Sequence, residues 1–595
     1  MSVTAIRSRA FLVLVALLAL VLGGCVSLPD GGGVETGSGP GQESPSDPPI
    51  DYRPSGPRPG SSPVGVVNGF LDAMTATPVT NQYALKFLTE TAQSSWVPED
   101  ATVVYGSETP DESGRFVTIE LTDTIRLDRR GEWLGNTSGG RDVTYQLELV
   151  KEKGEWRINN PPNAMMVPQS HFESRYQQYF LYFFDKAAQV LVPEPVYLPR
   201  GEQAATMLVR GLLLGADQAL LGVERTFLPA GTELEISAPV QPDGTADVPL
   251  SDEILDLNDE DLDRAMAQLA WTLGQVPGVE RMRITVDGSP LDSANRGPIQ
   301  DVRGWPEYDP SVNWASQELF GIREGYVVNL VGDLEQRIAG LFGSENYGLR
   351  SIAVDLPAQR VAGVGVDGTT VMVAPRARQT GEVPSSENVD VIYDGGEDLL
   401  KPAWDLYGQV WLMDRTAAGA ELSVVRDGTV TRLDVPGITG RKVKAFVVSR
   451  DGTRLVAVID GPQFDRLRTT RIMRNDEGDV RRLAASVELP VGAIQVNEIR
   501  DIAWRTPGSV ALLTGPVPGL SQVIVTLIDG SSALGDVASN AELFRNEARR
   551  IVTSPAPGSS LYVGTKNGQL FQLAANGRWT GTSIKGGLRS PTFVG

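Results

Sequence analysis

The sequence predicts a multidomain protein in which two small α+β domains are followed by an all-β propeller of about six blades. Three observations predict this. At about 100 to 200 residues per domain, 595 residues are enough for three or four folded units. Segments with helical periodicity alternate with strand-like segments up to about residue 290, and strand-like segments alone follow. That last part repeats with a period of about 40 to 56 residues.

The amino terminus has the pattern of a secretory signal. Arg7 and Arg9 precede the uninterrupted apolar stretch 10–22. A helix needs about 20 apolar residues to cross the hydrocarbon core, so this stretch is short for a permanent span. We therefore predict an exported protein.

Cys25 is the only cysteine and directly follows the small residues Gly23 and Gly24. The sequence Leu-Gly-Gly-Cys resembles the lipobox of bacterial lipoproteins, in which the cysteine is acylated and becomes the first mature residue. The resemblance implies a lipoprotein signal peptide at 1–24 and Cys25 as the lipid attachment site, which carries diacylglyceryl and palmitate-type chains. It also implies a protein held at the extracytoplasmic face of the cell membrane. The alternative is a secreted protein with a chance cysteine at its cleavage site.

Composition excludes several classes of protein. A net charge of −21 repels nucleic-acid phosphates, so we expect no nucleic-acid partner. One cysteine cannot form an intramolecular disulfide, so stability must come from burial. Residues 25–62 are rich in Gly, Pro, Ser, Asp and Glu, and this composition predicts a disordered tether.

Residues 63–165 form the first predicted α+β domain. Helical stripes at 64–74 and 83–88 precede four strand-like segments. The order is similar to that of nuclear-transport-factor-2-like domains. The strand-like segments are 102–105, 116–127, 143–150 and 155–158.

Residues 172–292 form the second α+β domain. The apolar runs 179–184 and 190–197 predict a hairpin, in which the aromatic side chains are core residues rather than a ligand platform. Asn258 is a predicted cap for a helix whose first turn is acidic, a better interpretation of that acidic run than a calcium loop. The order of elements resembles the GerMN domain of sporulation and germination proteins.

Residues 305–595 form the predicted propeller. Six segments align, and most continue into a turn and further strands, as in a propeller blade. The last segment supplies one strand only, so we predict that it shares a closing blade with residues 311–331. The six segments are 350–355, 400–405, 444–449, 500–505, 549–554 and 589–594.

A basic residue stands near the start of each repeat, although that of the second repeat comes one residue late. Equivalent positions of a propeller lie near one mouth of its channel, so these cations could form a ring for an anionic ligand or an acidic partner loop. Structural ion pairs with neighbouring blades are the favoured interpretation. The residues are Arg350, Lys401, Lys444, Arg500, Arg549 and Arg589.

No enzymatic signature was found in the sequence. It contains no Gly-x-Ser-x-Gly elbow, phosphate loop or HExxH motif, and a single histidine cannot build a His-rich metal site. Asp355 and Asp405 could form a carboxylate pair, but an aspartate at the end of an inner strand is a usual turn residue. We expect no catalytic residue, no cofactor, no metal and no enzymatic activity.

The combination of lipobox, tether, two α+β domains and propeller resembles the LpqB lipoproteins of actinobacteria along nearly the whole chain. This resemblance implies a non-catalytic accessory of the MtrA/MtrB two-component system that contacts the extracellular sensor domain of the histidine kinase. The alternative is a surface lipoprotein that binds or hydrolyses a cell-envelope glycan or lactone at the propeller mouth.

Overall fold

The computed structural model describes residues 51–135, 142–217, 220–292, 296–332, 334–376, 388–491, 498–531 and 543–595. Tyr52–Gly595 forms one compact unit. The predicted signal peptide, Cys25 and most of the predicted tether lie outside the described residues.

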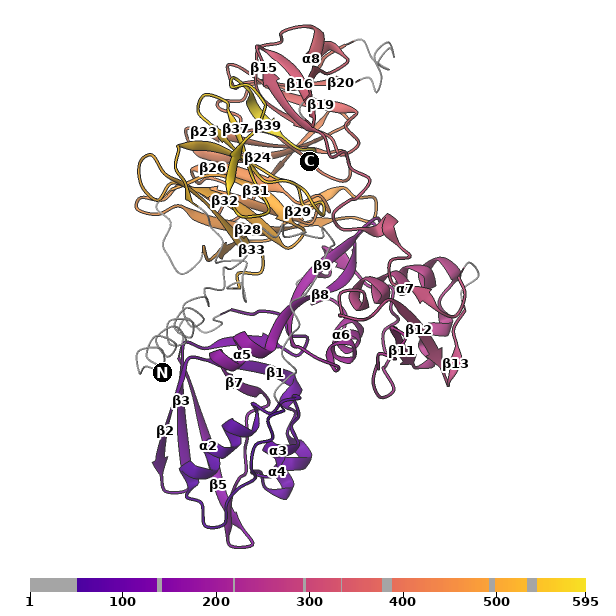
Figure 1. Ribbon diagram of the computed structural model, residues 1–595, viewed down its shortest axis with the longest axis vertical. Coiled ribbons are helices and arrows are strands. Elements are labelled where there is room, and N and C mark those ends of the chain that lie inside the picture. The colour runs from indigo at the N-terminus through magenta and orange to yellow at the C-terminus, as the bar shows by residue number, and fades with distance from the viewer. Residues whose placement is uncertain are drawn as a thin grey trace, which may run out of the picture. The chain divides into compact units, whose positions relative to one another are not determined.

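A helix packed on a four-stranded sheet makes the first domain (Figure 1). Helix α2 begins at Pro63 because the Ser62 hydroxyl accepts the Gly65 N–H, and its apolar face, which includes Phe70, is buried against the sheet. The sheet has the order β2-β3-β5-β6, and a smaller sheet has the order β4-β1-β7. The elements are α2 (Pro63–Ala73), α3 (Gln82–Leu85), α4 (Glu90–Ser95), β1 (Ala101–Tyr105), β2 (Ser107–Ser113), β3 (Phe116–Thr122), β4 (Ile125–Asp128), β5 (Val143–Glu152), β6 (Glu155–Ile158) and β7 (Met165–Pro168).

The second domain begins with helix α5 and the long hairpin β8–β9. Its other sheet pairs β11 and β12 in parallel, and α7 connects the two strands. Asn258 caps α7 as predicted, because its side chain accepts the N–H groups of Glu260 and Asp261. The elements are α5 (Gln169–Arg175), β8 (Tyr176–Asp185), β9 (Leu191–Pro199), α6 (Ala204–Leu213), β10 (Glu224–Arg225), β11 (Thr245–Leu250), α7 (Asp259–Leu273), β12 (Arg281–Val286), β13 (Ser289–Pro290) and β14 (Gln300–Asp301).

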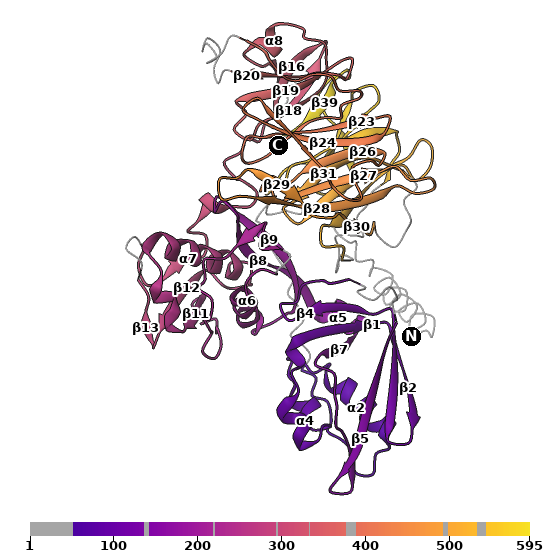
Figure 2. The same cartoon turned by 180° about the vertical axis from the view of Figure 1, so that it is seen from behind.

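Six antiparallel sheets follow, five with four strands and one with five, which confirms the predicted propeller of about six blades (Figure 2). The first five complete blades in chain order start with the inner strands β18 (Leu349–Val354), β22 (Ala403–Trp404), β26 (Val443–Val448), β31 (Ile499–Thr506) and β35 (Ala548–Val552). Their outer strands are β19 (Arg360–Gly365), β20 (Val371–Pro375), β21 (Asp390–Tyr393), β23 (Val410–Thr416), β24 (Gly419–Arg426), β25 (Thr429–Leu433), β27 (Arg454–Ile459), β28 (Arg466–Arg474), β29 (Val480–Leu483), β32 (Ser509–Thr514), β33 (Ser521–Leu527), β34 (Leu543–Phe544), β36 (Tyr562–Thr565), β37 (Leu570–Leu573) and β38 (Trp579–Gly581), with β30 (Val487–Leu489) added on β28.

The sixth blade joins two segments far apart in the sequence. Strand β39 (Arg589–Thr592) pairs with β15 (Leu319–Arg323), which continues into β16 (Tyr326–Val331) and β17 (Leu334–Arg337). The short helix α8 (Leu341–Ser344) then leads to the first complete blade. These are the two segments that the repeat pattern placed in one closing blade, and their pairing leaves no unpaired inner edge on β15.

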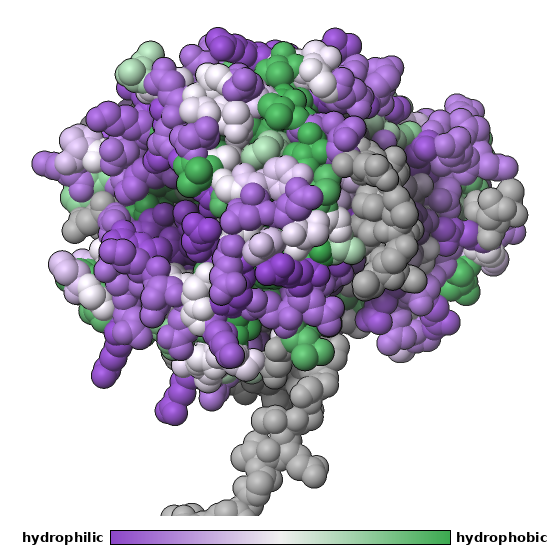
Figure 3. Space-filling model, turned by 90° about the horizontal axis from the view of Figure 1, so that it is seen from above, coloured by the Kyte–Doolittle hydropathy of each residue, from purple (hydrophilic) through white to green (hydrophobic). Residues whose placement is uncertain are grey.

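The face seen in Figure 3 is mostly hydrophilic, and apolar residues appear there in small groups. This surface agrees with a chain that carries 74 acidic and 53 basic residues.

Candidate functional site

The six predicted ring cations are placed at the starts of the inner strands, but most of them make ion pairs. Arg350 contacts Asp398 at 2.8 Å, Lys444 contacts Asp465 at 2.7 Å and Arg500 contacts Glu498 at 2.8 Å. Arg549 pairs with Glu547. Arg589 is exposed and Lys401 bonds to a hydroxyl, so the six side chains do not form one ring.

The six predicted cations coincide with the channel wall only in part. Three of the six residues, Arg350, Lys401 and Lys444, line the channel cavity. In the other three blades the lining residue is the next one along, namely Asp501, Arg550 and Ser590. Neighbouring residues of a strand face opposite sides of its sheet, so a shift by one residue moves a side chain away from the channel. Lys401, which looked one residue late, is the residue in phase with these three.

Lys401 is the central cation of the channel. Its ammonium donates a hydrogen bond to the Thr592 hydroxyl at 2.7 Å, so it links the second repeat to the closing strand β39. The Lys401 side chain is exposed to solvent and lines the channel cavity. Desolvation by the surrounding protein lowers the pKa of Lys401 to about 8, although the negative charge of Asp501 acts to raise it.

The hairpin β8–β9 meets the propeller through a second group of charges, which we call the hairpin junction: Glu194, Glu224, Arg454 and Arg471. Both oxygens of the Glu194 carboxylate accept from Arg471, at 2.7 and 2.6 Å, and one also accepts from Arg454. Arg454 and Arg471 are directly opposite each other on β27 and β28, where two like charges would repel. Glu194 therefore neutralises a repulsion inside the propeller.

The pKa values of the two junction carboxyl groups shift in opposite directions, although burial acts to raise both. For Glu194 burial alone would raise the pKa, but the charges of Arg454 and Arg471 outweigh it and hold the pKa well below its usual range. Burial and the neighbouring charge of Glu194 raise the pKa of Glu224 well above its usual value. Glu194 therefore holds the negative charge of the pair, and Glu224 binds its proton more tightly than a free glutamate does.

Sequence reasoning did not find this junction. The available signal was Glu194 itself, a carboxylate between two prolines in an otherwise apolar strand. A charge in such a run must find a partner, but the sequence does not say where in the chain the partner is.

Two aspartates considered as a carboxylate pair are turn residues. Asp355 accepts the backbone N–H groups of Gln359 and Arg360. Asp405 accepts those of Tyr407 and Gln409. Among the described residues there is also no cluster of three or more His, Cys, Asp or Glu side chains arranged to hold a metal ion.

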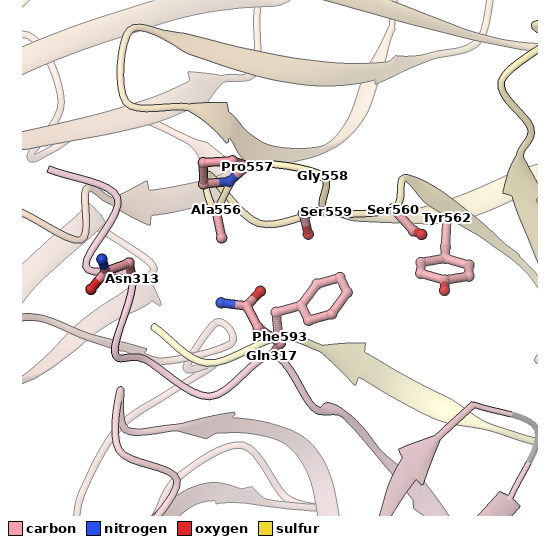
Figure 4. A pocket seen from close by; sticks show the side chains of 9 residues that line it. All are labelled: Asn313, Gln317, Ala556, Pro557, Gly558, Ser559, Ser560, Tyr562 and Phe593. Atoms are coloured by element: carbon pink, nitrogen blue, oxygen red, sulfur yellow. The ribbon is translucent and has the colours of Figure 1, made fainter. Parts of the chain in front are cut away.

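A second cavity, of about 460 Å³, opens beside the closing blade (Figure 4). Asn313 and Gln317 precede β15, while the stretch 556–560 connects β35 to β36. Its lining carries amide, hydroxyl and phenol groups but no Lys, Arg, Asp or Glu, so it offers hydrogen bonds without a charge.

Family models match three stretches of the chain. The N-terminal domain of lipoprotein LpqB matches 56–173, a sporulation and spore germination family matches 180–292, and the lipoprotein LpqB β-propeller domain matches 325–532. The fold and these matches define a multidomain lipoprotein with a germination-type domain and a propeller.

Curated relatives align with nearly the whole chain. Lipoprotein LpqB of Thermobifida fusca is 27% identical and the alignment covers 95% of this chain and 96% of that protein. Lipoprotein LpqB of Mycolicibacterium smegmatis is 26% identical, with 96% and 95% covered. The chain belongs to the LpqB lipoprotein family.

Among solved structures, the first GerMN domain of the sporulation protein GerM from Bacillus subtilis is 27% identical. The match covers 21% of this chain and 95% of that chain, with a TM-score of 0.18. TolB from Acinetobacter baumannii is 11% identical, covers 58% of this chain and 86% of that chain, and has a TM-score of 0.32.

The family is one of membrane-anchored envelope proteins. In the described part of the chain no helix is long and apolar enough to cross a membrane. The candidate anchor Cys25 lies outside that part.

Proposed function

We propose that the chain is a lipid-anchored protein of the extracytoplasmic face of the cell membrane that acts as a non-catalytic accessory of a sensor histidine kinase of the MtrA/MtrB type. It does so by binding the extracellular sensor domain of the kinase. The observation that carries the proposal is membership of the LpqB family over the full domain order.

The arrangement of charges supports a binding role rather than catalysis. The buried carboxylates of the junction and of the blade turns are engaged in structural hydrogen bonds. A general acid or base needs a carboxyl group that can reach a substrate, which these groups cannot do.

A pull-down tests the partner. The compact unit 52–595 is immobilised and incubated with the purified extracellular domain of the kinase, and with the extracellular domain of an unrelated sensor kinase as control. We expect retention of the first domain only. Equal retention of both domains, or of neither, contradicts the proposal. Turnover of cell-envelope glycan or lactone fragments by the same unit would favour the hydrolytic alternative instead.

Mass spectrometry of the full-length protein tests the anchor. We expect acyl chains on Cys25 and recovery in the membrane fraction, because two or three chains give durable attachment. Cys25→Ser is expected to leave the membrane fraction. An unmodified Cys25 in native material contradicts the proposed localisation.

A further inference from the structure

The channel of the propeller encloses a cavity of about 360 Å³. Its wall comes from all six blades, because residues next to or within the inner strands β18, β22, β26, β31, β35 and β39 line it. A cavity of this volume is of the size that holds small molecules.

The cavity is cationic although the chain carries a net charge of −21. Carboxylates outside the cavity neutralise three of its cations: Asp398 contacts Arg350 and Arg415, and Asp465 contacts Lys444. Three cationic side chains and one carboxylate side chain remain in the lining, which also includes Gly595. These side chains are Lys401, Arg450, Arg550 and Asp501.

The remaining cations have weak partners. Among the described residues no carboxylate oxygen lies within 4.0 Å of the Lys401 or Arg450 nitrogens, and Asp501 is 4.0 Å from Arg550. Arg450 donates only to the backbone carbonyls of Ser311 and Val594. A cation in a confined, low-dielectric space attracts an anion more strongly than a cation in bulk water does.

Three buried polar groups of the same lining lack a hydrogen-bond partner among the described residues. They are the Ser351 hydroxyl, the Trp504 indole N–H and the Arg450 Nε–H, in residues that are 9%, 6% and 4% exposed. All three can donate a hydrogen bond, and the last two can do nothing else. Since buried polar groups are normally paired, a molecule rich in acceptors would satisfy them.

The rest of the wall is apolar. Phe446, Val448 and Val552 are buried residues that line the cavity, and the ring of Trp504 adds to them. A ligand that fits both parts of the wall carries an oxyanion group and an apolar body.

We propose that the propeller channel binds a small organic anion, whose carboxylate or phosphate group is held by Lys401 and Arg550 and whose apolar body lies against Trp504 and Phe446. This site does not depend on the kinase partnership, so either can hold without the other.

Calorimetry on the unit 52–595 tests the site with acetate, hexanoate and inorganic phosphate as probes. We expect hexanoate to bind about tenfold or more tightly than acetate, because its additional methylene groups leave water. Binding of phosphate but not hexanoate would indicate that the natural ligand carries a phosphate group. Binding of hexanoate but not phosphate would indicate a carboxylate. Absence of heat with all three probes overturns the proposal.

Neighbouring arginines provide a matched control. Arg550→Gln removes a cation that lines the channel, whereas Arg549→Gln removes the preceding one, which pairs with Glu547 and does not line the cavity. The two side chains are similarly exposed, at 57% and 49%. We expect Arg550→Gln to weaken binding about tenfold and Arg549→Gln to leave it unchanged. Equal effects of the two substitutions overturn the proposal.

Lys401→Met and Ser351→Ala give independent variants in other blades, so the test survives if one of them fails to fold. Each is expected to weaken binding, with the larger loss for Lys401→Met. In the unmodified unit the affinity should fall above about pH 8, the pKa of Lys401, which is faced by Asp501 and Arg550. The proposal is overturned if both variants bind the probes as tightly as the unmodified unit does and the affinity of the unmodified unit does not fall above pH 8.

Discussion

The hairpin junction and the propeller channel use the same kinds of charged side chain in different ways. At the junction the Arg454 and Glu194 side chains are 2% and 5% exposed and each charge meets its opposite. In the channel Lys401 and Arg450 have no carboxylate within contact distance among the described residues. The charges of the junction are therefore paired within the chain, whereas two cations of the channel lack a carboxylate partner in the part of the chain that the structure describes.

This difference shows what to look for in a propeller. Paired buried charges hold segments together, because removal of one partner leaves a costly buried charge. Cations without a carboxylate partner in an accessible channel make only hydrogen bonds to neutral groups, which leave their charge uncompensated. Such cations are a better pointer to a ligand site than the number of basic residues at the blade ends.

The largest effect is expected from removal of both junction carboxyl groups. Glu194→Gln alone allows Glu224 to ionise beside Arg471, 3.5 Å away, which limits the loss. The double variant Glu194→Gln/Glu224→Gln leaves Arg454 and Arg471 opposite each other, with Asp451 at 3.9 Å from Arg454. We expect it to lower the free energy of unfolding by about 3 to 5 kcal/mol in chemical denaturation.

The exposed ion pair Lys153–Glu90 is the control for that experiment. Glu90→Gln should leave the denaturation midpoint nearly unchanged. A double junction variant as stable as this control would show that the junction is no more important than a surface pair.

A smaller effect of opposite sign is expected from Glu224→Gln. Burial and the charge of Glu194 raise the pKa of Glu224 in the folded protein, whereas the unfolded chain releases this proton above about pH 4.5. The folded state then binds more protons, so this group makes the protein less stable as pH rises above that value. The variant lacks this loss and should be more stable than the unmodified protein at neutral pH.

Denaturation at a series of pH values measures this difference. The greater stability of Glu224→Gln should vanish below about pH 4, where Glu224 is neutral in the folded and the unfolded state, as the glutamine is. A difference in stability that does not change with pH would contradict the raised pKa of Glu224.

The smallest effect is expected from Lys401→Met in the absence of ligand. The folded pKa of about 8 lies below the usual 10.5, so the unfolded chain binds more protons between these values and the group makes stability rise with pH there. The variant should match the unmodified protein in stability at neutral pH or slightly exceed it, and should lack this rise. A marked loss of stability would mean that Lys401 is structural, like the junction residues.

Much of the fold could be predicted because local periodicity in the sequence indicates its strands and helices. The repeat of inner strands predicted the blades, and Asn258 with its acidic turn predicted the start of α7. Strand β2 was missed, because Ser107–Ser113 has no apolar alternation and contains Pro110. It is an edge strand held by its pairing with β3, and that tertiary contact leaves no local signal.

The site was predictable only in part. The repeat led to the blade ends, but Arg500, Arg549 and Arg589 do not line the cavity, because alternation along a strand could not be fixed from the alignment of six short segments. The hairpin junction joins residues about 260 to 277 positions apart, and no pattern within either segment predicts that contact.

The pairing of Phe320 with Thr592 also determines the order of events when the chain folds. Five blades can assemble as an open arc, but the sixth is complete only when β39 pairs with β15. Contacts of such long sequence separation form late, because loop closure must precede them. Until β39 pairs with β15, the edge of β15 is unpaired. The risk of aggregation is therefore greatest in the interval before the propeller closes.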